Sequence, residues 1–260
     1  MKTHPFLWLL KAICFILLLA LAVHAEEAFY QALENSGWNE TEKNQLTMIV
    51  QQAEQDGLPT SPLHAKVYEG MAKNIPAERI IRAVSLANEQ HKAARTLSTK
   101  LSQAPLEQNA LFEHAVEAMT AGIPAQSIMA VMSHQHFSHP GVAQETLALM
   151  RDLARRGSSA EEVENLAQTI AKSRLSKREI GELRTEITRH GRWGKSDTFT
   201  RDITRRVSRG ERGSAAVRGS SSGGSSSQKS TNSSNPSRKG SGSSGGSHGS
   251  SKGGGSGSGR

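Results

Sequence analysis

Apolar residues recur every three or four positions through most of residues 26–188, which is the spacing of one buried face of an α-helix. The longest stripe begins at Ile80 and Val84 and continues to Leu97 and Leu101. Shorter stripes of the same period precede and follow it. The pattern predicts a run of short helices. Aromatic residues make up only 4% of the chain, so we expect a core of aliphatic side chains.

A short motif recurs where one stripe stops and the next begins: a residue that ends a helix, an apolar residue, and a residue that begins a helix. Glycine suits the first position because it readily adopts the left-handed conformation at a helix C-terminus, and proline or serine suits the last. The copies are Gly57-Leu58-Pro59, Asn74-Ile75-Pro76, Gly122-Ile123-Pro124, Gly157-Ser158-Ser159 and Arg174-Leu175-Ser176, the last two more degenerate. Capping boxes are predicted at Asn39/Glu42, Ser159/Glu162 and Ser176/Glu179.

The spacing of these motifs bears on the architecture. Their first residues lie 17, 48, 35 and 17 positions apart, and two 17-residue steps give about 34 residues, the length typical of a helical-hairpin repeat. The interval from Asn74 to Gly122 breaks this period. The sequence therefore predicts an all-α fold that is either an irregular helical bundle or a short helical-hairpin repeat array, with a disordered C-terminal tail.

Gly70 lies inside one of the predicted helices, where glycine is about 1 kcal/mol less favourable than alanine. No turn is needed at this position. We therefore expect a neighbouring helix to approach closely at Gly70.

The segment from Gly57 to Ile80 reads G-L-P-x-x-P-L-x-x-K-V-x-E-G-x-A-K-x-I-P-x-x-R-I, and a weaker copy follows near Gly122. It resembles a segment of uncharacterised exported bacterial proteins. The resemblance implies a protein of the bacterial envelope. It implies no activity, cofactor or catalytic residue.

The first 25 residues have the form of a secretory signal peptide. Lys2 supplies a basic start, residues 12–23 are apolar, and the residues before and at Ala25 suit a signal peptidase. We expect cleavage after Ala25 and a periplasmic or secreted protein. An uncleaved membrane anchor is the alternative, although about twelve apolar residues are few for a bilayer span. The single cysteine, Cys14, would be removed with the signal, so the mature chain would contain no disulfide and no cysteine ligand or nucleophile.

Charge divides the chain into further parts. Residues 26–172 contain 18 acidic and 12 basic side chains, a net −6, whereas residues 173–218 contain 13 basic and 6 acidic ones, a net +7. Residues 219–260 add five positive charges, and 31 of these 42 residues are glycine or serine. We expect an α-helical domain at 26–188, a basic linker with a short amphipathic helix at 189–218, and a disordered basic tail at 219–260.

The basic linker contains Phe199, Ile203 and Val207 at four-residue spacing, which predicts one amphipathic helix. Four arginines around that stripe are candidates for contact with an anionic surface: Arg201, Arg205, Arg206 and Arg209. The helix could dock on the acidic domain, lie on an anionic membrane surface through residues 197–210, or join the tail in binding an anionic polymer. Specific nucleic-acid binding is not expected, because the tail has no aromatic residues for base stacking.

The residues most suggestive of chemistry are three histidines in one predicted turn, His134, His136 and His139. Imidazoles bind Zn²⁺ or Cu²⁺, and His91 or His114 could join them, although the spacing matches no compact metal motif. The alternative is a solvated turn, with His91 and His114 as hydrogen-bonded histidines at the edge of the core. Without a metal, no cofactor is expected.

These features favour an exported, non-enzymatic interaction or scaffold protein whose partner is another protein or an anionic component of the envelope. Two alternatives stay open: a metal-binding envelope protein that uses residues 134–139, and an enzyme whose site cannot be recognised in the sequence.

Overall fold

The computed structural model describes residues 27–189 and 196–218. The predicted signal peptide, its cleavage after Ala25 and the predicted tail at 219–260 lie outside the described residues. Within the described ranges every regular element is a helix and none is a strand, so the predicted all-α fold is confirmed.

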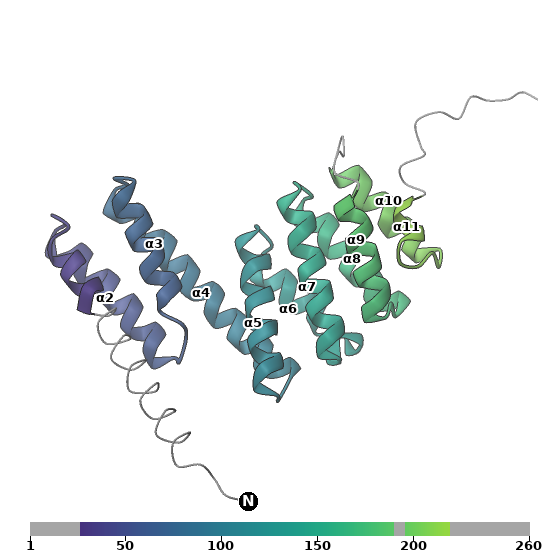
Figure 1. Ribbon diagram of the computed structural model, residues 1–260, viewed down its shortest axis with the longest axis horizontal. Coiled ribbons are helices and arrows are strands. Elements are labelled where there is room, and N and C mark those ends of the chain that lie inside the picture. The colour runs from purple at the N-terminus through teal and green to yellow at the C-terminus, as the bar shows by residue number, and fades with distance from the viewer. Residues whose placement is uncertain (1–26, 190–195, 219–260) are drawn as a thin grey trace, which may run out of the picture. The chain divides into compact units, whose positions relative to one another are not determined.

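Residues 27–34 are helical and precede the labelled elements of Figure 1. The others are α2 (Glu40–Gln55), α3 (Ser61–Ala72), α4 (Ala77–Leu101), α5 (Pro105–Thr120), α6 (Ala125–Met132), the 3₁₀ helix η1 (Gln135–Ser138), α7 (Pro140–Arg155), α8 (Ala160–Ser173), α9 (Lys177–Arg189), α10 (Ser196–Ser208) and α11 (Ala215–Arg218).

The helices from α4 onward alternate between two layers. One layer contains α5, α7, α9 and α11, each packed on the next, and Figure 1 shows α5, α7 and α9 side by side. The other layer contains α4, α6, α8 and α10, which also pack in succession. Alternation of this kind is the arrangement of a helical-hairpin repeat array, here with hairpins of unequal length.

The recurring motif ends helices as its composition predicts. The first residue of all five copies has a positive φ, including the two that are not glycine: Asn74 at 52° and Arg174 at 50°. In each copy the next residue donates its N–H five residues back into the helix, as Leu58 does to the Ala53 carbonyl at 2.9 Å. This pair of features is the Schellman ending of a helix. The local sequence therefore determines where five of the helices end.

The long interval between Asn74 and Gly122 contains two helices whose junction lacks the motif. Helix α4 runs for 25 residues and ends at Leu101, and the backbone of the next residue, Ser102, is extended. The Ser102 hydroxyl donates to Glu107 Oε2 at 2.6 Å and accepts from the Ala104 N–H at 3.1 Å. A serine with a following proline makes this turn, so no left-handed residue is needed.

The buried side chains form two clusters. The N-terminal core contains residues of the first helix, α2, α3 and the first half of α4; the C-terminal core contains residues from the second half of α4 to α11. Phe112 on α5 packs against both. Helix α4 and Phe112 therefore join two otherwise separate cores.

Gly70 sits where α3 meets α4. A Cβ atom added at Gly70 would lie 2.6 Å from both Cγ1 and Cδ1 of Ile80, which is 2% exposed in the N-terminal core. The close approach expected at this glycine is present, and it explains why a glycine stands inside a helix.

Candidate functional site

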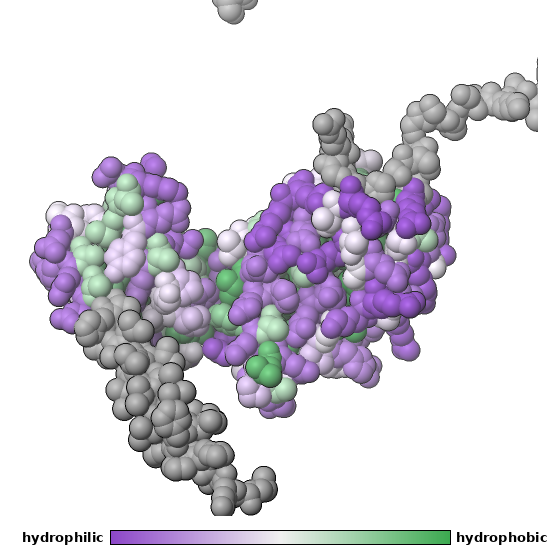
Figure 2. Space-filling model, in the orientation of Figure 1, coloured by the Kyte–Doolittle hydropathy of each residue, from purple (hydrophilic) through white to green (hydrophobic). Residues whose placement is uncertain are grey.

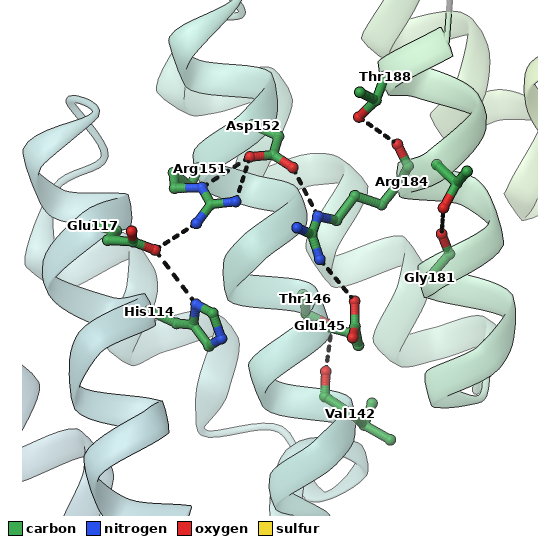
Figure 3. Close-up of polar contacts among 11 residues, drawn as sticks. His114, Glu117, Val142, Glu145, Thr146, Arg151, Asp152, Gly181, Arg184 and Thr188 are labelled. Carbon is green, nitrogen blue, oxygen red and sulfur yellow. Dashed lines mark hydrogen bonds and ion pairs between the residues drawn. The ribbon is translucent and has the colours of Figure 1, made fainter.

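Five charged side chains form a continuous network across α5, α7 and α9 (Figure 3). Arg151 Nη1 donates to Glu117 Oε2 at 2.5 Å, and Arg151 Nη2 lies 2.7 Å from Asp152 Oδ1. The other oxygen of Asp152 accepts from Arg184 Nε at 2.7 Å, and Arg184 Nη1 donates to Glu145 Oε2 at 3.2 Å. Asp152 thus connects the two arginines and links three successive helices of one layer.

The helical repeat places these groups together. Glu145 and Asp152 are seven residues apart on α7, so both lie on the same side of that helix, facing α9. His114 and Glu117, three residues apart on α5, face α7 from the other side, with His114 Nδ1 3.4 Å from Glu117 Oε2. Stacking of the helices then brings Arg184 of α9 into reach.

The pKa values of two members of the network, Glu117 and Arg151, are shifted toward their charged forms. Burial alone would raise the pKa of Glu117, but hydrogen bonds and charges from Arg151 and His114 lower it below its ordinary value. Burial alone would lower the pKa of Arg151, but Asp152 and Glu117 raise it. Each of the five charges has a partner of opposite sign. The network therefore links α5, α7 and α9 in a defined register.

An open groove runs along α9 beside this network, with a volume of about 710 Å³. Its residues come from α7, from one side of α9 and from the C-terminal segment. They are Glu145, Lys177, Arg178, Gly181, Glu182, Thr185, Glu186, Arg189, Ser214 and Arg218. The groove therefore combines charges of both signs with two hydroxyl groups and one glycine.

The histidines of the predicted turn have other partners. His136 Nε2 lies 2.8 Å from the Leu175 carbonyl, so this nitrogen carries a proton and donates. His134 Nδ1 accepts from the His136 N–H at 3.2 Å, and His139 is the residue before α7. Across residues 27–189 and 196–218, no group of three histidine, cysteine, aspartate or glutamate side chains is arranged to hold a metal ion.

The two histidines on apolar stripes lie differently from each other. His91 is 4% exposed and packs edge-to-face on Phe112, with Nδ1 buried and unpaired within the described residues. His114 is half-buried beside Glu117. A third histidine, His64, is also buried and stacks on Phe29, with 4.1 Å between the two ring centroids. Burial lowers the pKa of both His64 and His91.

The basic segment docks against α8 through its apolar face. Ile203 and Val207 are fully buried in the C-terminal core, and Phe199 packs against that core. A buried polar contact also joins α10 to the rest of the domain. The Thr200 hydroxyl lies 2.8 Å from the hydroxyl of Ser158, which stands in the fourth copy of the motif where the other copies have an apolar residue.

Docking of α10 changes the capping box predicted at Ser159/Glu162. The Ser159 hydroxyl accepts from the Glu162 N–H at 3.4 Å, as expected. However, the Ser159 N–H donates to Asp197 Oδ1 at 2.6 Å, and Glu162 Oε1 accepts from Arg201 Nε at 2.9 Å. In a full capping box the Glu162 carboxylate would accept from the Ser159 N–H. Here each of these two groups is instead bonded to a residue of α10, Asp197 or Arg201. The boxes at Asn39/Glu42 and Ser176/Glu179 form in full.

The four candidate arginines differ in their contacts within the chain. Arg201 pairs with Glu162, Arg205 with Asp202, and Arg206 Nη1 lies 2.9 Å from Glu211 Oε2. Arg209 is exposed and follows directly after α10. Three of the four are thus engaged within the chain.

The charged network was not predicted, although part of it is visible in the sequence. Glu145 and Asp152 lie two helical turns apart, a spacing that indicates an acidic face on one helix. Their partner Arg184 lies 32 residues beyond Asp152. Only the stacking of α7 on α9 connects them.

No family model, curated protein or solved structure matches the chain at a significant level. No helix among the described residues is sufficiently long and apolar to span a bilayer.

Proposed function

We propose that this protein is an exported, non-enzymatic interaction or scaffold module of the bacterial envelope. The observation that carries the proposal is the layer formed by α5, α7 and α9, with its charged network and the open groove beside it. Stacked helical hairpins commonly bind partners on an extended surface of one layer. Here the network stabilises that surface, and the groove gives it a place for a partner.

The basic tail extends this proposal. Its five positive charges, without any acidic residue, favour weak attachment to anionic material of the envelope. The resemblance of residues 57–80 to exported bacterial proteins and the predicted signal peptide support the same compartment.

A photo-crosslinking experiment tests the interaction surface. The photoreactive residue p-benzoylphenylalanine replaces Thr185, an exposed groove residue on α9, in the full chain in envelope preparations. The matched control carries it at Thr96, an exposed threonine on α4. We expect a defined adduct from position 185 that is absent from position 96. Equal labelling at both positions, or no adduct from either, would overturn the proposed interaction surface.

Two further measurements test export and attachment. Mass spectrometry of the mature protein should show Glu26 as its first residue, and an intact N-terminus would contradict cleavage. Replacing all five tail lysines and arginines by serine should abolish salt-sensitive co-sedimentation with envelope fractions. Undiminished co-sedimentation of that variant would exclude attachment through the tail charges.

A further inference from the structure

Gly181 lies in the interior of α9 without any internal packing that requires a glycine. A Cβ atom added there would have Glu145 Oε2 as its nearest neighbour, at 3.9 Å, which is an ordinary contact. Its φ is not positive, so no turn needs it. Gly70 has Ile80 pressed against it, but among the described residues nothing comparable approaches Gly181. A glycine weakens a helix interior, so its presence calls for another explanation.

The position of Gly181 supplies one. It lines the groove along α9, between Arg178 and Thr185, where a missing side chain widens the groove. The groove is open to solvent and lies along the helix, which suits an extended segment better than an enclosed small molecule. A bound backbone could approach the helix most closely at Gly181.

The charges that this groove turns outward are mainly positive. The side chains of Arg178, Arg189 and Arg218 are 86%, 68% and 64% exposed. The groove carboxylates are less exposed: Glu182 at 45%, Glu145 at 25% and Glu186 at 8%. Each of the three carboxylates also has a basic partner within the chain: Arg184 pairs with Glu145, and both Arg189 and Arg218 pair with Glu186. Glu182 lies 3.4 Å from Arg178 Nε. A partner therefore meets guanidinium groups first.

We infer that the groove along α9 binds an acidic, extended peptide segment of a partner protein, with Gly181 as the point of closest approach. This inference rests on the proposed interaction function and specifies its partner. Glutamate or aspartate side chains of the segment would pair with Lys177, Arg178 and Arg189. The hydroxyls of Thr185 and Ser214 also line the groove. The Thr185 hydroxyl donates to the Gly181 carbonyl at 2.8 Å, so toward the bound segment it can act only as an acceptor for a backbone N–H.

A peptide fits this groove better than a uniform polyanion such as nucleic acid. Glu145, Glu182 and Glu186 line the same groove as the basic residues. A phosphate backbone would bring negative charge against all three carboxylates at a regular spacing. A peptide can instead place a carboxylate beside each arginine and a neutral residue beside each glutamate.

Fluorescence anisotropy with the full chain tests the inference. The probe is a fluorescein-labelled decapeptide that alternates glutamate with glycine, compared with its lysine counterpart and with a labelled DNA duplex. We expect the glutamate peptide to bind about tenfold or more tightly than the lysine peptide, and more tightly than the duplex. Tighter binding of the duplex would overturn the peptide assignment in favour of a polyanion surface.

Substitutions locate the binding. Gly181→Leu fills the groove floor and should weaken peptide binding about tenfold or more, whereas the control Thr96→Leu on α4 should leave it unchanged. Arg178→Gln should weaken binding about threefold and reduce its salt dependence. Helicity of each variant is checked by circular dichroism. Unaltered binding by Gly181→Leu would sink the groove assignment, while a crosslinked adduct at position 185 would still support the broader function.

Discussion

The substitution Gly70→Ala tests the packing of α3 on α4 most directly. Helix propensity alone predicts that alanine would stabilise the protein by about 1 kcal/mol. The structure predicts the opposite, because the new methyl group would lie 2.6 Å from two carbon atoms of Ile80. Carbon atoms prefer separations of about 3.5–4.0 Å, so Ile80 would have to move by about 1 Å within a packed core.

The magnitude follows from the difference of these two effects. Overpacking of a core costs about 1–3 kcal/mol, which equals or exceeds the gain of about 1 kcal/mol in helix propensity. We expect Gly70→Ala to lower the free energy of unfolding by up to about 2 kcal/mol. Urea unfolding of the full chain, followed by circular dichroism, measures this change.

Two matched variants isolate the cause. Gly181→Ala also replaces a glycine within a helix but meets no close neighbour, so it should stabilise the protein by about 0.5–1 kcal/mol. Ile80→Ala removes the obstructing atoms, and in that background Gly70→Ala should become stabilising. A Gly70→Ala protein at least as stable as the wild type, or an effect that is unchanged by Ile80→Ala, would refute the reasoning.

Three further predictions concern backbone strain, pH and the charged network. Arg174→Gly should stabilise the protein by about 0.5–1 kcal/mol in thermal or urea unfolding, because it relieves a left-handed arginine; a loss of stability would contradict this. Burial lowers the pKa of His64 and His91, so the unfolded chain takes up their protons more readily as the pH falls. Stability should be full above about pH 7 and decline below about pH 6.5, by up to about 1.4 kcal/mol per pH unit for each histidine; urea unfolding of His91→Gln should show a shallower decline, and an identical pH profile would argue against it. Asp152→Asn should cost about 1–3 kcal/mol of unfolding free energy, against less than about 0.5 kcal/mol for Glu78→Gln in an exposed ion pair; equal losses would show that the network adds nothing.

The sequence anticipated features that depend on a few neighbouring residues. All five copies of the recurring motif end helices with the expected left-handed residue, because backbone conformation at a helix end is set within about six residues. The two complete capping boxes are local in the same sense. The close approach at Gly70 could also be expected, although its partner Ile80 could not be identified from the glycine alone.

The architecture was only partly predictable for a physical reason. A 48-residue interval without the motif left both an irregular bundle and a repeat array open. The junction at Ser102 closes with side-chain hydrogen bonds, which the motif does not include. Alternation of the helices between two layers emerges only when their apolar faces are packed together.

By itself, then, the sequence determined helix identity and most helix ends, because these follow from local backbone preferences and the period of apolar residues. The tertiary structure alone decided which charges meet. Arg184 donates to Asp152, and Arg201 donates to Glu162, which was predicted to complete a capping box with Ser159. It also created the groove along α9, whose residues are contributed by three separate segments. Such contacts join residues that are tens of positions apart in the sequence. They depend on how the helices stack, which no local sequence pattern specifies.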